Sequence, residues 1–493
     1  MGRVVTHDLS RLGSRGMAAD QDFSISNVLV SPVEYAVKIQ DGVFDNTFGL
    51  IMREGADDYS TAWTSGNPIQ IFEYLAADGT SRIVASTATD LFEVTTTTKT
   101  SRVGALTPTA GDWKFLNFNG KVLGWQASHT PIVKTGAGNF AAITASTGTL
   151  PDGHAACSAF GRVWAVDDDK QTIRYCALLD ETKWATADGG GSIDMRSVWT
   201  QGMDEVIAIE SFGSNLVVFG RRHIIIWTDG SGSQLGLDPL NMYVTDTLDF
   251  VGAINRNAVT LVGELDVVFW STTGLRSLAR TLQERASPAN DISPFNRLYL
   301  ASGVDLTSST SMAAIRMAYY AVKGLVLVYA PALSRILAID VKGSEPRTTQ
   351  WFLGTVTALA TLKVGSLLFG LSTGLLGVMP SAAGKDFGSA INFITESGWI
   401  DIRSEGGREQ ALKMLRGTAG NGTVGIEYKT DFDSTTLGSA VVSAPASDTG
   451  AKFWLSLRGR GTHFRIYLKM GDALNSTKSI GSLFLYTKPM RIG

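Results

Sequence analysis

The sequence contains little cysteine and little histidine. Cys157 and Cys176 are the only cysteines in 493 residues, which excludes a disulfide scaffold, and we expect both to be reduced, partly buried thiols. The histidines show no spacing typical of metal ligands; they are His7, His129, His154, His223 and His463. We therefore predict no metal site and no cofactor.

The chain also lacks an uninterrupted hydrophobic run. Its N-terminal residues, Met-Gly-Arg-Val-Val-Thr-His-Asp, include no apolar core of a signal peptide. The most apolar stretch, from Thr355 to Pro380, is interrupted by Lys363 and four glycines. This pattern favours two buried strands over a membrane helix, so we expect no membrane anchor.

Acidic and basic residues nearly balance, since the net charge is −3. Such a balance argues against a protein that coats nucleic acid, but it allows a wall past which nucleic acid slides. The distribution is uneven: residues 401–493 carry 13 basic and 8 acidic side chains, a net +5, which leaves −8 for the rest. This asymmetry is either ordinary surface variation or the mark of a C-terminal unit that meets an acidic partner.

Glycine and apolar residues are abundant, and they occur in a repeat. The chain has 53 glycines and 44% hydrophobic residues. Seven times, an apolar strand leads through a short glycine-, asparagine- or serine-containing turn into a very apolar strand, followed by a polar turn and another strand. The very apolar strands are 82–86, 121–125, 162–166, 215–219, 266–270, 325–329 and 366–370.

The spacing of this repeat predicts a β-propeller. Successive very apolar strands lie 39 to 59 residues apart, and four-stranded propeller blades recur every 40–50 residues or so. A continuous apolar run fits a strand that neighbouring blades bury on both faces. We predict about seven blades, with six or eight possible, and long loop insertions at Gly230–Asn241 and Arg285–Ser311. A β-sandwich or a solenoid of unrelated hairpins is the alternative.

Three regions follow along the chain. Residues 1–68 are expected to be an N-terminal arm with strands that dock a partner; residues 1–24 are polar and irregular, and Val33–Ile39 alternates like a strand. Residues 69–390 are assigned to the propeller. Residues 391–493 show half-buried strands of period two, which predict a C-terminal β-sandwich. Within that unit, Glu409–Leu415 fits either a strand or a short helix.

Candidate chemistry is sparse. Asp167–Asp169 presents hard oxygens suited to calcium, or it is a solvated hairpin tip. Asp229–Gly232 has the glycines of a phosphate loop, but no helix or lysine follows as such a loop requires. Arg221 and Arg222 are a single pair, whereas propeller glycosidases and lyases need convergent carboxylates or an arginine cluster. We therefore predict that the protein is not an enzyme. Four tryptophans lie on strands of the repeat, and we predict that they are part of the core: Trp164, Trp227, Trp270 and Trp351.

Three segments carry a resemblance to a known family. Residues 46–55 end in Arg53-Glu54-Gly55, where that family often has Arg-Pro-Gly. A hairpin over 160–176 leads to Asp180 and Trp184, and the segment 457–467 has the form Gly-Arg, aromatic, Arg-Ile. With the propeller repeat and the C-terminal strands, the chain resembles the tail nozzle of short-tailed bacteriophages, also called packaged-DNA stabilisation protein or tail tubular protein B.

This resemblance implies a structural protein of the virion tail, made in the host cytoplasm. It would form a homohexameric ring below the portal and adaptor rings, with tail fibres or a tail needle attached. The lumen of the ring would continue the DNA channel, retain packaged DNA and pass it at ejection without reading its sequence. Two other functions stay open on the sequence: a glycan-binding propeller of a tail fibre or adhesin, and a propeller glycosidase or lyase.

Overall fold

The structure is a computed structural model, and it describes most of the chain. The described residues are 4–20, 33–45, 49–64, 66–200, 202–229, 238–263, 266–283, 292, 296–343, 345–381, 384–403, 409–420, 422–431, 435–444, 451–471 and 479–489.

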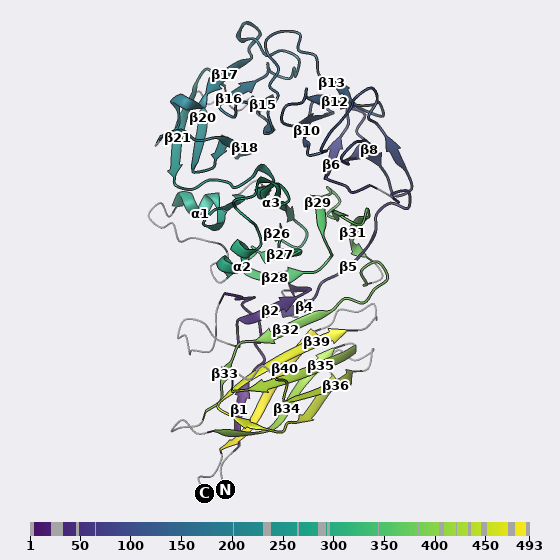
Figure 1. Cartoon of the computed structure of the whole chain (residues 1–493), viewed down its shortest axis with the longest axis vertical. Helices are drawn as coiled ribbons and strands as arrows, with labels where there is room; N and C mark the ends of the chain where they lie inside the picture. The colour runs from purple at the N-terminus through teal and green to yellow at the C-terminus, as the bar shows by residue number, and fades with distance from the viewer. Residues whose placement is uncertain are drawn as a thin grey trace.

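Seven antiparallel blades follow one another around a central axis and form a β-propeller, six of them separate sheets and one the end of a larger sheet (Figure 1). Blade 1 contains β6 (Gln70–Leu75), β7 (Ser81–Ser86), β8 (Leu91–Val94) and β9 (Lys99–Ser101). Blade 2 contains β10 (Lys114–Phe118), β11 (Lys121–Trp125), β12 (Ile132–Thr135) and β13 (Ala141–Ala142). Blade 3 contains β14 (Ala156–Ala159), β15 (Arg162–Val166), β16 (Thr172–Tyr175) and β17 (Gly191–Asp194). Blades 4 and 5 are β18 (Val206–Phe212), β19 (Asn215–Gly220), β20 (His223–Asp229) and β21 (Met242–Asp249); and β22 (Val259–Val262), β23 (Asp266–Ser271) and β24 (Gly274–Ser277). Blades 6 and 7 are β25 (Arg316–Tyr320), β26 (Leu325–Ala330), β27 (Arg335–Asp340) and β28 (Arg347–Trp351); and β29 (Val356–Thr361), β30 (Leu367–Leu371), β31 (Leu376–Ser381) and β5 (Gly55–Asp58).

The predicted repeat is confirmed. Each of the seven very apolar segments is the second strand of a blade, and in β26 every residue is buried. The glycine turns between first and second strands have a steric cause. Gly120 has a φ of 70°, and a Cβ at this position would lie 2.8 Å from the backbone of Ala77. Only glycine takes such a conformation at no cost.

The last blade is closed by a strand from the N-terminal region. Strand β5 pairs antiparallel with β31, with Asp57 opposite Val378 and Asp58 opposite Gly377. A Cβ on Gly55 would lie 2.3 Å from the carbonyl oxygen of Lys385, so the close approach of the two segments requires glycine. The first 68 residues thus supply the outer strand that completes the last blade of the ring and covers the edge of β31.

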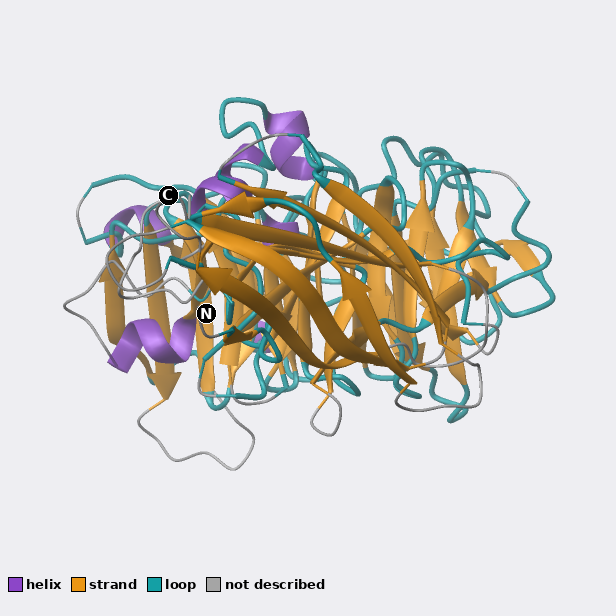
Figure 2. Ribbon diagram, turned by 90° about the horizontal axis from the view of Figure 1, so that it is seen from below, coloured by secondary structure: helices purple, strands orange, loops and turns teal. Residues whose placement is uncertain are grey.

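The remaining strands form a second unit, which we call the flank unit. One of its sheets contains β1 (Val5–Asp8), β3 (Gly42–Asp45), β4 (Gly49–Met52), β34 (Gln410–Gly420), β37 (Ala451–Ser456), β38 (Arg460–Gly461) and β40 (Ser479–Pro489). The other contains β2 (Ala36–Gln40), β32 (Phe393–Ser397), β33 (Ile400–Asp401), β35 (Gly422–Thr430), β36 (Gly438–Ala444) and β39 (His463–Gly471). Figure 2 shows these long, twisted strands in front of the upright strands of the propeller.

The two sheets of the flank unit share one core, as a β-sandwich does. Leu415 and Leu485 from the first sheet and Ile426 and Ile466 from the second are fully buried in one cluster. The second sheet continues into the propeller, because Gln40 of β2 pairs in parallel with Gln350 of blade 6. The flank unit therefore extends a blade instead of hanging from a linker.

Two expectations for local structure are corrected. Residues 1–24 are not irregular throughout, because β1 pairs with β40 over four residues; the partner strand is more than 470 residues away, so no local pattern reveals it. The alternative left open at Glu409–Leu415 resolves to a strand, since β34 begins at Gln410.

The two predicted insertions have different outcomes. Within Arg285–Ser311 the structure has α2 (Arg297–Ser302) and the start of α3 (Ser309–Ala313), so the described part of this segment is not a plain loop. Of Gly230–Asn241, only 238–241 belong to the described residues. The other helices are α1 (Leu278–Gln283) and three 3-10 turns at Thr186–Asp188, Met195–Ser197 and Arg256–Ala258. No helix in the described ranges is long and apolar enough to cross a membrane.

Candidate functional site

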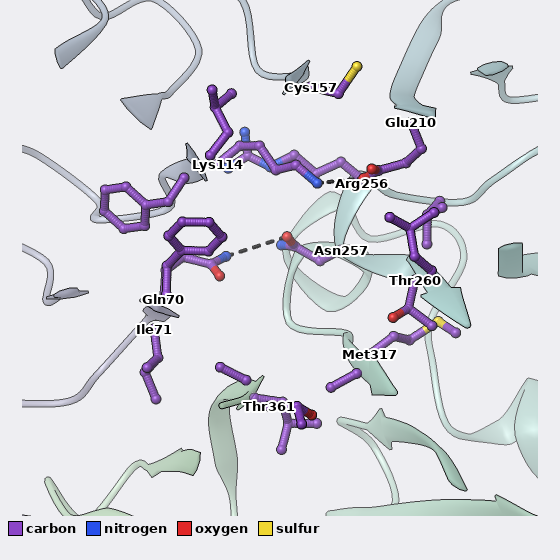
Figure 3. A pocket seen from close by; sticks show the side chains of 18 of the residues that line it. Gln70, Ile71, Lys114, Cys157, Glu210, Arg256, Asn257, Thr260, Met317 and Thr361 are labelled. Carbon is purple, nitrogen blue, oxygen red and sulfur yellow. Dashed lines mark hydrogen bonds and ion pairs between the residues drawn. The ribbon is translucent and has the colours of Figure 1, made fainter. Parts of the chain in front are cut away.

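The candidate site is a cavity of about 630 Å³ at the centre of the propeller. Residues from the first strand of every blade, or from the segments next to it, line the cavity (Figure 3). The first strands lie closest to the axis, so side chains of these strands and of the adjoining segments meet across it. A volume of this size suits a small molecule.

An ion pair spans the cavity at one end. Arg256, just before the first strand of blade 5, places Nη2 2.9 Å from a carboxylate oxygen of Asp112, just before the first strand of blade 2. The same guanidinium donates to the backbone carbonyl oxygens of Asp112 and His154. One buried arginine thus ties blades 2, 3 and 5 together.

Two amides extend this network. The Gln70 amide of blade 1 donates to Asp112 Oδ1 at 2.8 Å and to Asn257 Oδ1 at 3.4 Å (Figure 3). Asn257 in turn donates to Asp112 Oδ1 at 3.4 Å. The Asp112 carboxylate therefore accepts from three side chains of blades 1 and 5, which places it at the hub of a polar cross-link between opposite sides of the propeller.

The electrostatics of the hub keep Asp112 ionised. Burial opposes ionisation, but the charges of Arg256 and Arg316 outweigh it and lower the pKa of Asp112 to about 2. His154, in contrast, stays uncharged, because burial and the nearby charges of Arg256 and Lys170 lower its pKa to about 4. Its neutral ring fits the hydrogen bond of 3.1 Å between Nε2 and the carbonyl oxygen of Ile207.

A second ion pair joins blades 2 and 4 at the side of the cavity. Lys114 Nζ of blade 2 lies 2.6 Å from Glu210 Oε1 of blade 4, so the pair passes in front of blade 3. Cys157 lines the cavity there, and burial together with the charge of Glu210 raises the pKa of its thiol, which therefore stays protonated. Lys114–Glu210, like Arg256–Asp112, thus joins segments of different blades at the cavity.

The sequence-predicted candidates are not brought together. Asp167–Asp169 lies in the hairpin between β15 and β16, where Asp167 pairs with Arg174 at 2.8 Å and Asp169 with Arg196 at 3.0 Å. Among the residues that the structure describes, no group of three His, Cys, Asp or Glu could hold a metal ion. These carboxylates neutralise arginines of their own blade.

The other candidates also have structural partners. The backbone N–H groups of Arg221 and Arg222, in the hairpin between β19 and β20, donate to the carboxylate of Asp204 at 3.1 and 2.7 Å. Gly230–Gly232 of the glycine-rich run lies outside the described residues. Three of the four tryptophans are in the core, with at most 2% exposure, and Trp227 is half-buried; the three are Trp164, Trp270 and Trp351.

Arg53, in the segment that carries the family resemblance, is the most informative charged residue outside the cavity. Its side chain is fully buried, with Nε 2.8 Å from Asp41 Oδ1 and Nη1 2.8 Å from Asp386 Oδ1. Burial alone would lower the pKa of Arg53, but the two carboxylates outweigh it and raise the pKa. Asp41 lies between β2 and β3, and Asp386 follows blade 7, so Arg53 joins the flank unit to the point of ring closure.

The other two resembling segments have local roles. Trp184 is buried, and its indole N–H donates to the carbonyl oxygen of Glu181 at 2.8 Å. In the C-terminal segment, the backbone N–H of Arg458 donates to the Tyr428 hydroxyl oxygen at 3.0 Å, whereas Arg460 stays exposed. The sequence therefore pointed to Arg53 only through resemblance, and it gave no sign of the Arg256–Asp112 pair, whose members are 144 residues apart.

The chain has a partial likeness to several solved structures, among them a WD40 propeller domain. The WD40 propeller domain of Doa1 has 10% sequence identity and a TM-score of 0.38 over 66% of this chain and 97% of that chain. BBS1N, solved in complex with ARL6DN, has 12% identity and a TM-score of 0.38 over 68% and 99%. The extracellular domain of a putative hybrid two-component system from B. thetaiotaomicron has 8% identity and a TM-score of 0.29 over 82% and 47%. No family model and no curated protein matches the chain.

Proposed function

We propose that this protein is the subunit of a tail nozzle of a short-tailed bacteriophage, a structural component of the virion tail. Six copies form a ring below the adaptor ring, and tail fibres or a needle attach to it. The observation that carries the proposal is the place of Arg53. The segment that resembles the family contains Arg53, whose ion pairs with Asp41 and Asp386 join the flank unit to the ring closure of the propeller.

The DNA channel of such a nozzle lies between copies, not through the middle of one propeller. The pairs Arg256–Asp112 and Lys114–Glu210 cross the central cavity, whose volume is about 630 Å³. A wall of seven cross-linked blades is rigid, which suits a ring that retains DNA under pressure. With a net charge of −3, the wall does not hold phosphate strongly, so DNA slides along it.

Electron microscopy of the purified full-length protein, alone and mixed with an adaptor ring, tests this proposal. We expect six-fold rings with an axial channel that dock coaxially on the adaptor. A protein that remains monomeric at every concentration and does not join the adaptor contradicts the proposal. In that case a glycan array is the next measurement, because a specific hit from a monomer would support the glycan-binding propeller instead.

A further inference from the structure

Exposed apolar side chains of the flank unit gather at two opposite edges. Within the described part of this unit, every large apolar side chain that is strongly exposed lies on or beside β1, β36 or β37. Val4 and Val5 are 50% and 37% exposed at the β1 edge. At the other edge Leu437, Val441 and Trp454 are 45%, 74% and 59% exposed. Figure 1 shows β1 and β36 on opposite sides of the unit.

The strands at these two edges have unused hydrogen-bonding sides. In the sheet order β1, β40, β34, β37, strand β1 pairs with β40 alone and β37 pairs with β34 alone among the described residues. Proteins protect such edges with proline, a bulge, charged side chains or a very short strand. Neither strand contains proline, and no bulge interrupts either pairing. The four-residue β1 contains Asp8 and β37 contains Lys452, two charges of opposite sign that attract instead of repelling each other when the edges meet.

The directions of the strands allow the two edges to meet. All neighbours in this order are antiparallel, so β1 and β37 run in opposite directions. A rotation about an axis parallel to the strands preserves strand direction in the next copy. The β37 edge of one copy therefore meets the β1 edge of the next as an antiparallel pair, and because the two edges differ, the contact repeats head to tail until a ring closes.

The exposed side chains are complementary on the outer face of this sheet. Register places Asp8, Phe484, Arg416 and Trp454 in one row across the four strands, so Asp8 and Trp454 share a face. Lys452 lies two residues before Trp454 on that face and is exposed, as is Asp8. On this face the β1 edge thus presents the acidic Asp8 with Val4 four residues before it, and the β37 edge presents the basic Lys452 beside the exposed indole of Trp454. Val5, opposite the buried Thr487, lies on the other face.

We propose that copies of this chain assemble by strand addition, in which β1 of one copy extends the sheet of its neighbour beyond β37. The partner is a second copy of the chain, and the inference rests on the ring proposed above. Main-chain hydrogen bonds hold the strands, Trp454 and the Val4–Val5 edge supply apolar area, and Asp8 and Lys452 set the register.

Substitution of the edge residues tests the inference. Trp454→Glu should abolish rings or weaken association roughly tenfold or more, because it places a charge in the contact. Tyr243→Glu is the matched control, since Tyr243 is 51% exposed on β21, an outer strand of the propeller, and rings should persist. Circular dichroism checks that both variants fold. Intact rings in a folded Trp454→Glu variant would overturn the interface.

Charge exchange and cross-linking show which edges meet. Asp8→Lys and Lys452→Asp should each weaken the ring, and the double variant should restore it; a double variant weaker than either single one would contradict the pairing. Thr6→Cys combined with Lys452→Cys or with Ser456→Cys should give a ladder of disulfide-linked copies in at least one combination, whereas each single variant should not cross-link. Cys157 and Cys176 are buried and do not compete. If the wild-type protein forms rings but neither double-cysteine variant gives a ladder, the proposed interface is wrong and the proposed nozzle still stands. If the wild-type protein forms no rings, the proposed nozzle is wrong.

Discussion

The propeller and the flank unit differ in how far their edge strands are protected from pairing with another chain. In the propeller, β5 from the N-terminal region completes blade 7, and ion pairs join blade 2 to blade 5 across the central cavity and blade 2 to blade 4 past blade 3. Its longest outer strand, β21, contains a bulge and Asp246, which discourage pairing with another chain. In the flank unit, β1 and β37 pair without a bulge, and their charges, Asp8 and Lys452, are opposite in sign. This difference is why we propose that the propeller supplies rigidity and the flank unit supplies the contact between copies.

The largest effect should follow from breaking the link between the two regions. Arg53→Met leaves the buried carboxylate of Asp41 and the partly buried carboxylate of Asp386 without their cation, which should cost about 3 kcal/mol or more of stability. Equilibrium unfolding in urea measures the loss. Arg11→Met is the matched control, because Arg11 pairs with Glu34 at the surface and its side chain is 78% exposed. That change should cost about 0.5 kcal/mol or less. Equal losses in the two variants would show that Arg53 does not hold the regions together.

The sequence predicted the propeller well because its signal is local and repeated. Each very apolar segment is a strand buried on both faces, so residues such as those of β26 carry the signal without reference to the rest of the chain. The half-buried strands of the C-terminal sandwich are local signals too. What escaped prediction is long-range pairing: β1 with β40, and β5 with β31. These strands are four residues long and carry charges, so neither their length nor their composition marks them.

The polar centre of the propeller escaped prediction for a related reason. Gln70, Asp112 and Arg256 each precede or begin the first strand of a different blade, and only ring closure brings them together. In the sequence they are isolated polar residues between apolar strands. Arg53 was singled out by resemblance alone, and its burial between two carboxylates shows a structural reason for an arginine there.

A smaller loss of stability should appear at acidic pH, because of His154. His154 has a pKa of about 4 in the folded protein and about 6.5 when unfolded, so the unfolded chain binds more protons between these values. Stability should therefore fall as the pH drops from about 6.5 to 4, by about 2 to 3 kcal/mol from this group. His154→Gln cannot gain the charge and should flatten the profile in that window, measured by urea unfolding at several pH values. A variant with the wild-type slope would show that His154 is not responsible.

The smallest effect should be that of Trp454→Glu on the rate of thiol labelling, a measurement that separates the two regions directly. Cys157 and Cys176 both lie in or beside the strands of blade 3, and burial raises the pKa of Cys176 to about 11. Near pH 8 the thiolate is then about a thousandth of the total, so both should label only when the propeller opens. Arg53→Met should speed labelling, because it loosens ring closure, whereas Trp454→Glu should leave the rate of the monomer unchanged. Faster labelling in Trp454→Glu would mean that the edge of the flank unit and the closure of the propeller are one cooperative structure, and the division between rigidity and association would not hold.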